Sequence, residues 1–272
     1  MLIMNEPKPH KSMTRPMIRL ENGDRAADQA DLIVEEPLSI RIDGQPYAVV
    51  MRTPGDETGH VAGFCLAEGL IDRPEDIATI GFCAEEGTNV ATVTLTPERR
   101  AAVDNLLARK GFVSQTSCGI CGKEVVRDMQ QILRPLSASV RFSSGQIMAA
   151  LDLLASSQKL YQSSRGAHAA LIVDAQGRLL AFAEDVGRHN ALDKAVGRVF
   201  LDRGLNAAAM GLMSSRMSYE LVQKAARAGL EILAGFSRPT SLAVDLALTV
   251  NMTLICFQDN RLLVFSGPER II

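Results

Sequence analysis

The sequence predicts an α/β protein whose second half is a three-layer sheet domain with partly parallel strands. Short apolar segments alternate there with segments of helical periodicity. In order they read strand, strand, helix, strand, helix, strand, helix, strand, strand, which is typical of helices packed on a mixed sheet. A length of 272 residues with 47% hydrophobic content suffices for one large domain or two smaller ones.

The first half of the chain predicts a smaller α+β region. Leu38–Val50 alternates around Asp43-Gly44, the pattern of a hairpin. Gly59–Ile71 has helical apolar spacing, and Asn89–Leu95 predicts a strand. We therefore expect a flexible N-terminal arm over 1–30, an α+β region over 31–140 and an α/β domain over 141–272.

The second half follows a serine-rich stretch, Pro135–Gly145, that predicts a linker. A helix is expected next, over Gln146–Gln162. A further helix is expected to open with Pro239 in its first turn. Strands are expected over 168–174, 179–186, 208–215, 230–237, 253–259 and 262–267, and helices over 188–204, 218–229 and 239–251.

Charge and composition exclude several classes of protein. A net charge of -2 provides no bulk basic field for nucleic acid, so we expect no nucleic-acid partner. No apolar run approaches the ~20 residues that span a bilayer, and the first twenty residues do not form a secretory signal. Five cysteines without such a signal argue against a disulfide framework. We therefore expect a cytoplasmic protein with free thiols and no membrane partner.

Two of these cysteines, Cys118 and Cys121, lie in the glycine-rich stretch SCGICGK just before a predicted helix over Glu124–Leu133. Structural zinc needs four ligands, and a second CxxC or an HxxxH is absent from the sequence. A thioredoxin-like redox site expects the pair after an early strand. A sulfur carrier is the third option, since Lys123 and a helix N-terminus favour the reactive thiolate. The residues alone leave the three options open.

Three predicted strand-to-helix junctions carry dense polar residues, and no P-loop or GxGxxG is present. Helix capping explains part of this density. However, ligands of open α/β sheets bind beyond the carboxyl ends of strands, and arginines there suit an anionic, nucleotide-like ligand. The candidate residues are Asp185, Gly187, Arg188, His189, Asn190, Asp193 and Lys194 at the first junction, Ser214, Ser215 and Arg216 at the second, and Thr240 at the third.

The motifs SCGICGK, HAALIVD, EDVGRHNALDKAVG and SSRMSYELVQKAARAG followed by SRPTSLAV together resemble the formate dehydrogenase accessory sulfurtransferase family (FdhD-like proteins). The resemblance runs from about Glu36 to the C-terminus. It implies that Cys118, assisted by Cys121, holds a persulfide taken from a cysteine desulfurase. The sulfur then passes to the molybdenum bis(molybdopterin guanine dinucleotide) cofactor before its insertion into formate dehydrogenase. The chain would bind that cofactor as substrate and hold no tightly bound metal of its own.

The resemblance also implies a homodimer and a cofactor loop at CFQDNR, which gives Phe257, Gln258, Asp259, Asn260 and Arg261 as further candidates. The family is similar in fold to cytidine deaminases, so a cytidine-deaminase-like domain is expected. The zinc ligands and glutamate of a deaminase are missing at the corresponding junctions, so deamination is not expected. An alternative function is a non-catalytic chaperone that binds and protects the cofactor.

Overall fold

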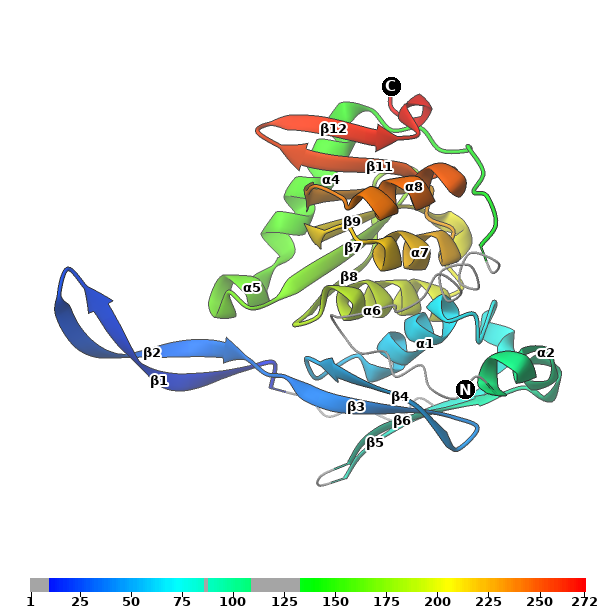
Figure 1. Ribbon diagram of the computed structural model, residues 1–272, viewed down its shortest axis with the longest axis horizontal. Coiled ribbons are helices and arrows are strands. Elements are labelled where there is room, and N and C mark those ends of the chain that lie inside the picture. Colours follow the sequence, from blue (N-terminus) through cyan, green and yellow to red (C-terminus); the bar gives the residue numbers. More distant parts are fainter. Residues whose placement is uncertain (1–9, 86–87, 109–132) are drawn as a thin grey trace.

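The computed structural model describes residues 10–85, 88–108 and 133–272. It is a mixed α/β structure with separate sheets in its two halves (Figure 1). The first half holds a four-stranded sheet in the order β4-β3-β6-β5, with α1 packed on its inner face. Its elements are β3 (Glu36–Ile42), β4 (Gln45–Arg52), α1 (Glu57–Ala67), the 3-10 helix η1 (Pro74–Asp76), β5 (Ile77–Glu85), β6 (Thr88–Leu95) and α2 (Pro97–Ala108).

The second half holds a six-stranded sheet in the order β12-β11-β10-β9-β7-β8. Strands β9, β10 and β11 are parallel, whereas β7 is antiparallel to both of its neighbours and β12 to β11. Its elements are α4 (Ser144–Ser157), α5 (Lys159–Ser164), β7 (His168–Asp174), β8 (Leu179–Asp185), α6 (Arg188–Leu201), η2 (Leu205–Ala207), β9 (Ala208–Arg216), α7 (Tyr219–Arg227), β10 (Ile232–Ser237), α8 (Ser241–Thr249), β11 (Thr253–Gln258), β12 (Arg261–Ser266) and η3 (Pro268–Arg270).

Helices cover both faces of this sheet. Helix α4 packs on one face, where Ile147, Leu151 and Leu154 are buried against apolar residues of β7, β9 and β10. Helices α6, α7 and α8 cover the other face. The predicted order of elements from residue 168 onward is therefore confirmed, and so is the mixed α/β class. The cytidine-deaminase-like layering stays a prediction.

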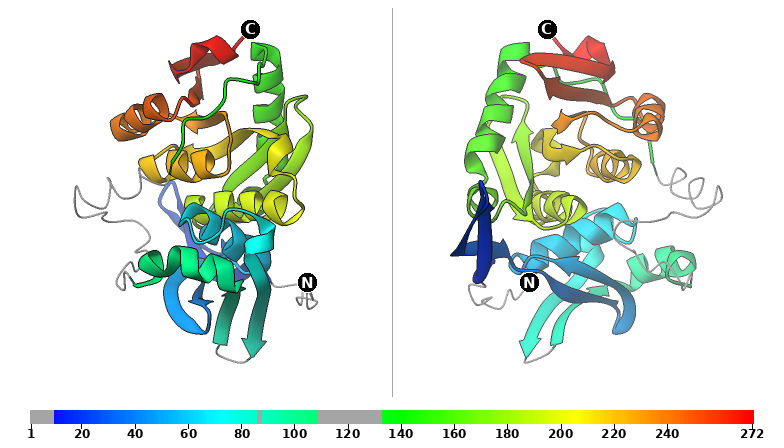
Figure 2. Two further views of the ribbon diagram at one scale, coloured as in Figure 1. Left: turned by 90° about the vertical axis from the view of Figure 1, so that its right-hand side faces the viewer. Right: turned by 60° about the vertical axis from the view of Figure 1, so that its left-hand side comes forward.

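The two halves meet where α1 packs against α6 (Figure 2, right). The helix backbones approach so closely that glycine is required at the contact. A Cβ on Gly197 would overlap the carbonyl group of Gly59, and a Cβ on Gly63 would overlap the carbonyl group of Asp193. Backbone rather than side-chain contact therefore sets the spacing of the two helices.

The N-terminal segment differs from the expected flexible arm. Residues Ser12–Glu21 (β1) and Asp24–Ile33 (β2) form a two-stranded antiparallel ribbon that projects from the body (Figure 1). Its turn is Asn22-Gly23, with φ of 52° and 91°. Both positions of a type I′ turn require positive φ, which makes Asn-Gly a strong hairpin signal. Asn22-Gly23 therefore folds this segment into a ribbon instead of the expected flexible arm.

The serine-rich stretch is fastened to the second half rather than being a free linker. Glu231 accepts hydrogen bonds from the Ser137 and Ser139 hydroxyls and from the Ser139 amide. The fully buried Arg270 also donates to Glu231, at 3.2 Å. Burial acts to raise the pKa of Glu231, but these hydrogen bonds outweigh it, and the pKa is lowered. This segment thus packs with the six-stranded sheet.

Two helix boundaries also differ from the expectation. The helix expected over 146–162 is divided at Gln158 into α4 and α5. Helix α8 begins at Ser241, with Thr240 as its N-cap, so Pro239 lies outside the helix. The Thr240 hydroxyl accepts a hydrogen bond from the Ala243 amide, so helix capping explains this candidate residue. Within the described residues, no helix is long and apolar enough to cross a membrane.

Candidate functional site

The predicted junctions lie on one edge of the six-stranded sheet. Strands β8, β9, β10 and β11 all end there, because β8 is antiparallel to β7 and β7 is antiparallel to β9. Strand β7 runs the other way, so its first residue, His168, lies at the same edge beside Asp185. We call this boundary the carboxyl edge. Since it unites side chains from distant parts of the sequence, it is the candidate site.

Four arginines occur along the carboxyl edge, namely Arg188, Arg216, Arg238 and Arg261. Arg216, Arg238 and Arg261 are exposed. Arg188 opens α6 and is half-buried, and its Nε atom is buried without a hydrogen-bond partner. None of the four forms an ion pair with a carboxylate in the described part of the chain. The edge therefore presents guanidinium groups that are available to an anion.

The cofactor loop predicted at CFQDNR lies at the same edge. Phe257 packs edge-on against Phe236 at 6.0 Å, and Gln258 accepts a hydrogen bond of 2.9 Å from Arg238. Asp259 and Asn260 form the tight turn between β11 and β12, with φ of 53° and 56°. Asp and Asn tolerate this left-handed conformation better than most residues. They therefore build the hairpin without the glycine expected there.

The hydroxyl groups of the second junction already bind main-chain atoms. Ser214 accepts a hydrogen bond from the Ala169 amide at 2.8 Å. Ser215 is buried and donates to the Arg216 carbonyl group at 3.3 Å. Both serines thus hold the end of β9 in position beside Arg216.

His189 of the first junction contacts residues of the second. Its Nε2 atom is 3.0 Å from a carboxylate oxygen of Glu220 and 3.3 Å from the Ser218 hydroxyl. The hydrogen bond from His189 lowers the pKa of Glu220, although burial opposes this. The pair joins the start of α6 to the start of α7.

Several predicted ligand residues are instead buried between the halves. Asp185 is fully buried, accepts hydrogen bonds from the amides of Thr53 and Gly187, and lies 2.7 Å from the Lys194 ammonium group. Lys194 also donates to the Thr53 carbonyl group at 2.6 Å. Asn190 donates to Asp185 and to the Met51 carbonyl group. These polar groups are engaged by the first half of the chain, so we assign them to interdomain contact rather than ligand contact.

Asp193 belongs to the same buried layer. Both of its carboxylate oxygens accept hydrogen bonds of 2.8 Å from Lys224 of α7. Burial acts to lower the pKa of Lys224, but the carboxylates of Asp193, Glu68 and Glu220 together outweigh it, and the pKa is raised. Gly187 is the N-cap of α6. A Cβ at this position would lie 2.7 Å from the side-chain Nδ2 atom of Asn190. Both residues thus have structural explanations.

The thiol pair Cys118 and Cys121 lies outside the described residues, so its predicted role stays a prediction. The flanking elements can be placed. Leu136 donates its amide to the Val250 carbonyl group, and Leu133 lines a cavity with Gly229, just before β10 begins. These residues lie at the amino ends of β10 and β11, opposite the carboxyl edge (Figure 1). Within the described ranges, no three His, Cys, Asp or Glu side chains gather as a metal site.

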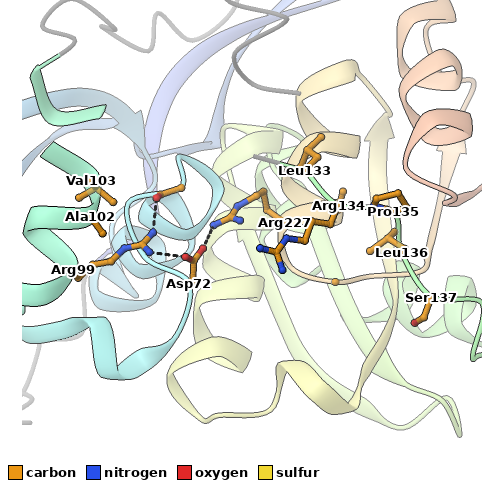
Figure 3. A pocket seen from close by; sticks show the side chains of 13 residues that line it. Asp72, Arg99, Ala102, Val103, Leu133, Arg134, Pro135, Leu136, Ser137 and Arg227 are labelled. Carbon is orange, nitrogen blue, oxygen red and sulfur yellow. Dashed lines mark hydrogen bonds and ion pairs between the residues drawn. The ribbon is translucent and has the colours of Figure 1, made fainter. Parts of the chain in front are cut away.

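That cavity has a volume of about 700 Å³ (Figure 3). Two of its three arginines are structural, because Arg99 and Arg227 hold Asp72 at 2.6 and 2.7 Å and also donate to main-chain carbonyl groups. Arg134 is exposed and points toward this cluster in Figure 3.

Comparison with known proteins identifies the family. The model of the FdhD/NarQ family matches residues 33–272. The chain belongs to this family. It is 38% identical over 265 residues to a protein named sulfur carrier protein FdhD from Anaeromyxobacter dehalogenans, with 93% of this chain and 91% of that protein covered. A protein of the same name from Streptomyces coelicolor is 36% identical, and 94% of each chain is covered.

A solved structure has the same fold as this FdhD/NarQ family member. It is described as a putative formate dehydrogenase accessory protein from Desulfotalea psychrophila. The TM-score is 0.78 at 26% identity, with 97% of this chain and all of that chain covered. The family resemblance inferred from the sequence is thus confirmed.

Some residues of this family member escape sequence reasoning. Thr53 binds both Asp185 and Lys194 through its backbone, which no side-chain pattern signals. His60 is fully buried in α1, and neither of its ring nitrogens has a hydrogen-bond partner. Burial, followed by the charge of Lys194, lowers its pKa.

Proposed function

We propose that this protein is a sulfur carrier for the maturation of formate dehydrogenase. It takes sulfur from a cysteine desulfurase as a persulfide on Cys118 and delivers it to the molybdenum bis(molybdopterin guanine dinucleotide) cofactor. The names of its relatives and of its structural neighbour support the role. The CxxC motif, which the sequence alone left open, supports the chemistry.

Binding of the cofactor, the second step of the proposal, is supported by the arginines of the carboxyl edge that have no ion-pair partner in the described part of the chain. A guanine dinucleotide contains phosphate groups, and guanidinium groups bind phosphate oxygens in pairs. Arg188, Arg216, Arg238 and Arg261 face no ion-pair partner among the described residues. A basic rim on a protein of net charge -2 favours one local anionic ligand over general nucleic-acid binding.

The transfer uses both thiols, one to accept the sulfur and one to release it. The Cys118 thiolate attacks the terminal sulfur of the donor persulfide, so that one S–S bond breaks on the donor and another forms on Cys118. Release as sulfide requires two electrons. The Cys121 thiolate supplies them by attacking the inner sulfur of Cys118, which forms a Cys118–Cys121 disulfide, and a cellular dithiol then reduces this disulfide.

The proposed setting includes cytoplasmic location, a cysteine desulfurase, formate dehydrogenase and a second copy of the chain in a homodimer. The sulfur and cofactor roles are separable, and each has its own test below.

Replacing an edge arginine should weaken the binding of guanosine diphosphate, which carries the guanine and phosphate groups of the cofactor. Arg216→Ala should raise the dissociation constant by about ten- to a hundredfold, because one charged hydrogen-bonding group is lost. Calorimetric titration of the full chain measures this. Arg178→Ala is the matched control, since Arg178 is exposed at the β7–β8 turn on the opposite edge and pairs with Asp174. Equal affinity of wild type and the Arg216 variant would remove Arg216 from the site.

Formate dehydrogenase activation separates the carrier from the alternative chaperone. In a bacterial strain that lacks its own family member, wild type should restore formate dehydrogenase activity. Cys118→Ala and the Cys118→Ala, Cys121→Ala double variant should not, whereas Cys83→Ala should, since Cys83 is an exposed thiol on β5. Restoration by the double variant would instead support a chaperone that only binds and protects the cofactor.

A further inference from the structure

The cavity of about 700 Å³ lies between the two halves of the chain (Figure 3). Helix α2 and the turn after α1 form one wall, and the end of α7 and residues 133–137 form the other. Its volume falls within the roughly 300–1,000 Å³ that is typical of ligand pockets. It lies at the amino ends of β10 and β11, so a cofactor bound at the carboxyl edge does not account for it. We call it the arginine pocket.

Two arginines of the arginine pocket are held in fixed positions. Arg99 and Arg227 each make three hydrogen bonds, two to main-chain carbonyl groups and one to a carboxylate oxygen of Asp72. A guanidinium group has five N–H donors, so both arginines retain donors that no described residue accepts. Their side chains are 14% and 13% exposed where they line the pocket. Donors that are already fixed bind an anion without the entropic cost of ordering a free side chain.

Arg134 adds an exposed guanidinium group to the same pocket. It points toward Arg99 and Arg227 in Figure 3, and it has no ion-pair partner in the described part of the chain. Among the lining residues, three guanidinium groups face one carboxylate, that of Asp72, which leaves a formal charge of +2. The pocket is thus locally basic on a chain of net charge -2, and it favours an anionic ligand.

The remaining lining of the pocket is largely apolar. Ala102 and Val103 of α2 lie on one wall, and Leu133 and Leu136 lie on the other. A small inorganic anion would use the arginines but leave these apolar side chains in contact with water. A peptide segment that carries both acidic and apolar side chains matches both parts of the lining, and clusters of arginine are a recurring means of recognising acidic motifs.

The walls of the pocket flank the predicted sulfur-binding thiols in the sequence. Helix α2 ends at Ala108, ten positions before Cys118, and Leu133 lies twelve positions after Cys121. Chains of this length span at most about 40 Å, so covalent geometry keeps the thiols within that distance of the pocket. A globular protein that delivers sulfur to Cys118 is therefore large enough to contact the pocket at the same time.

We propose that the arginine pocket is the docking site for an acidic peptide segment of the protein that donates sulfur to Cys118. Carboxylates of that segment accept hydrogen bonds from Arg99, Arg134 and Arg227, and its apolar side chains pack against the apolar walls. The proposal rests on the sulfur-carrier function, since that function requires a donor protein. It separates the surface that recognises the donor from the carboxyl edge, which faces the opposite way.

Charge reversal at Arg134 tests this docking site. Calorimetric titration of the full chain with a bacterial cysteine desulfurase measures the affinity directly. Arg134→Glu should raise the dissociation constant at least about tenfold, because attraction of an acidic segment becomes repulsion. The difference should shrink as the salt concentration rises. Arg141→Glu is the matched control and should bind like wild type. Arg141 is equally exposed, donates only to nearby main-chain carbonyl groups and does not line the pocket.

Persulfide loading of the same proteins separates docking from sulfur chemistry. Arg134→Glu should load more slowly than wild type at low desulfurase concentration and equally fast at saturation. From the persulfide of N-acetylcysteamine, a small neutral donor without a carboxylate, both should load at the same rate. Equal affinity of wild type and Arg134→Glu for the desulfurase would overturn the docking site, and so would equal slowing with both donors. A wild type that binds the desulfurase through Arg134 but gains sulfur from neither donor would instead refute the sulfur-carrier function.

Discussion

Gly197→Ala is expected to abolish the native fold or to destabilise it by more than about 4 kcal/mol. A methyl group at this position would occupy the space of the Gly59 carbonyl group in α1. Both contacting groups are main chain in helices, so relief requires α1 and α6 to move apart. Such movement would open the apolar core between the halves and break the buried Asp185–Lys194–Thr53 contacts. Overpacking combined with unpaired buried charge accounts for the size of the effect.

Thermal and denaturant unfolding of purified variants measure this effect, together with the yield of soluble protein. Gly145→Ala is the matched control, since Gly145 also lies in a helix, α4, and its Cβ would meet only Ser143 Oγ at 3.9 Å. That control should be neutral or slightly stabilising, because alanine is the better helix former. A Gly197→Ala protein that melts within a few degrees of wild type would show that α1 and α6 tolerate separation.

The order of elements in the second half was predictable from local pattern. Each strand there is a short apolar run, and each helix shows an apolar face with a capping or turn residue at its boundary. The pattern of the ribbon is weaker, because no face of it is buried in this chain and its strands lack clean alternation. Asn22-Gly23 was the one local signal for it.

The candidate site was predictable only in part, because sequence records charge but not burial. EDVGRHNALDK combines two kinds of residue within eleven positions. Arg188 and His189 face the carboxyl edge or the neighbouring α7, whereas Asp185 and Lys194 turn inward. Thr53, which binds both Asp185 and Lys194, belongs to the other half of the chain and is more than a hundred positions away. No local pattern could separate the two sets.

The central claim concerns which sulfur atom accepts the cargo. Persulfide formation requires a thiolate. Cys65 and Cys256 are fully buried, and burial raises the pKa of both thiols, so neither provides a thiolate near neutral pH. Cys83 is exposed on β5, without the neighbouring Lys123 and predicted helix N-terminus that favour a thiolate at Cys118. Sulfur should therefore load at Cys118, and its replacement should remove loading almost completely.

The most direct measurement is the intact mass of the protein after incubation with a cysteine desulfurase and cysteine, with and without subsequent reduction. Wild type and Cys83→Ala should each gain one sulfur that a reductant removes, and Cys118→Ala should gain none. Equal gain in wild type and Cys118→Ala, or no gain in wild type, would contradict the account.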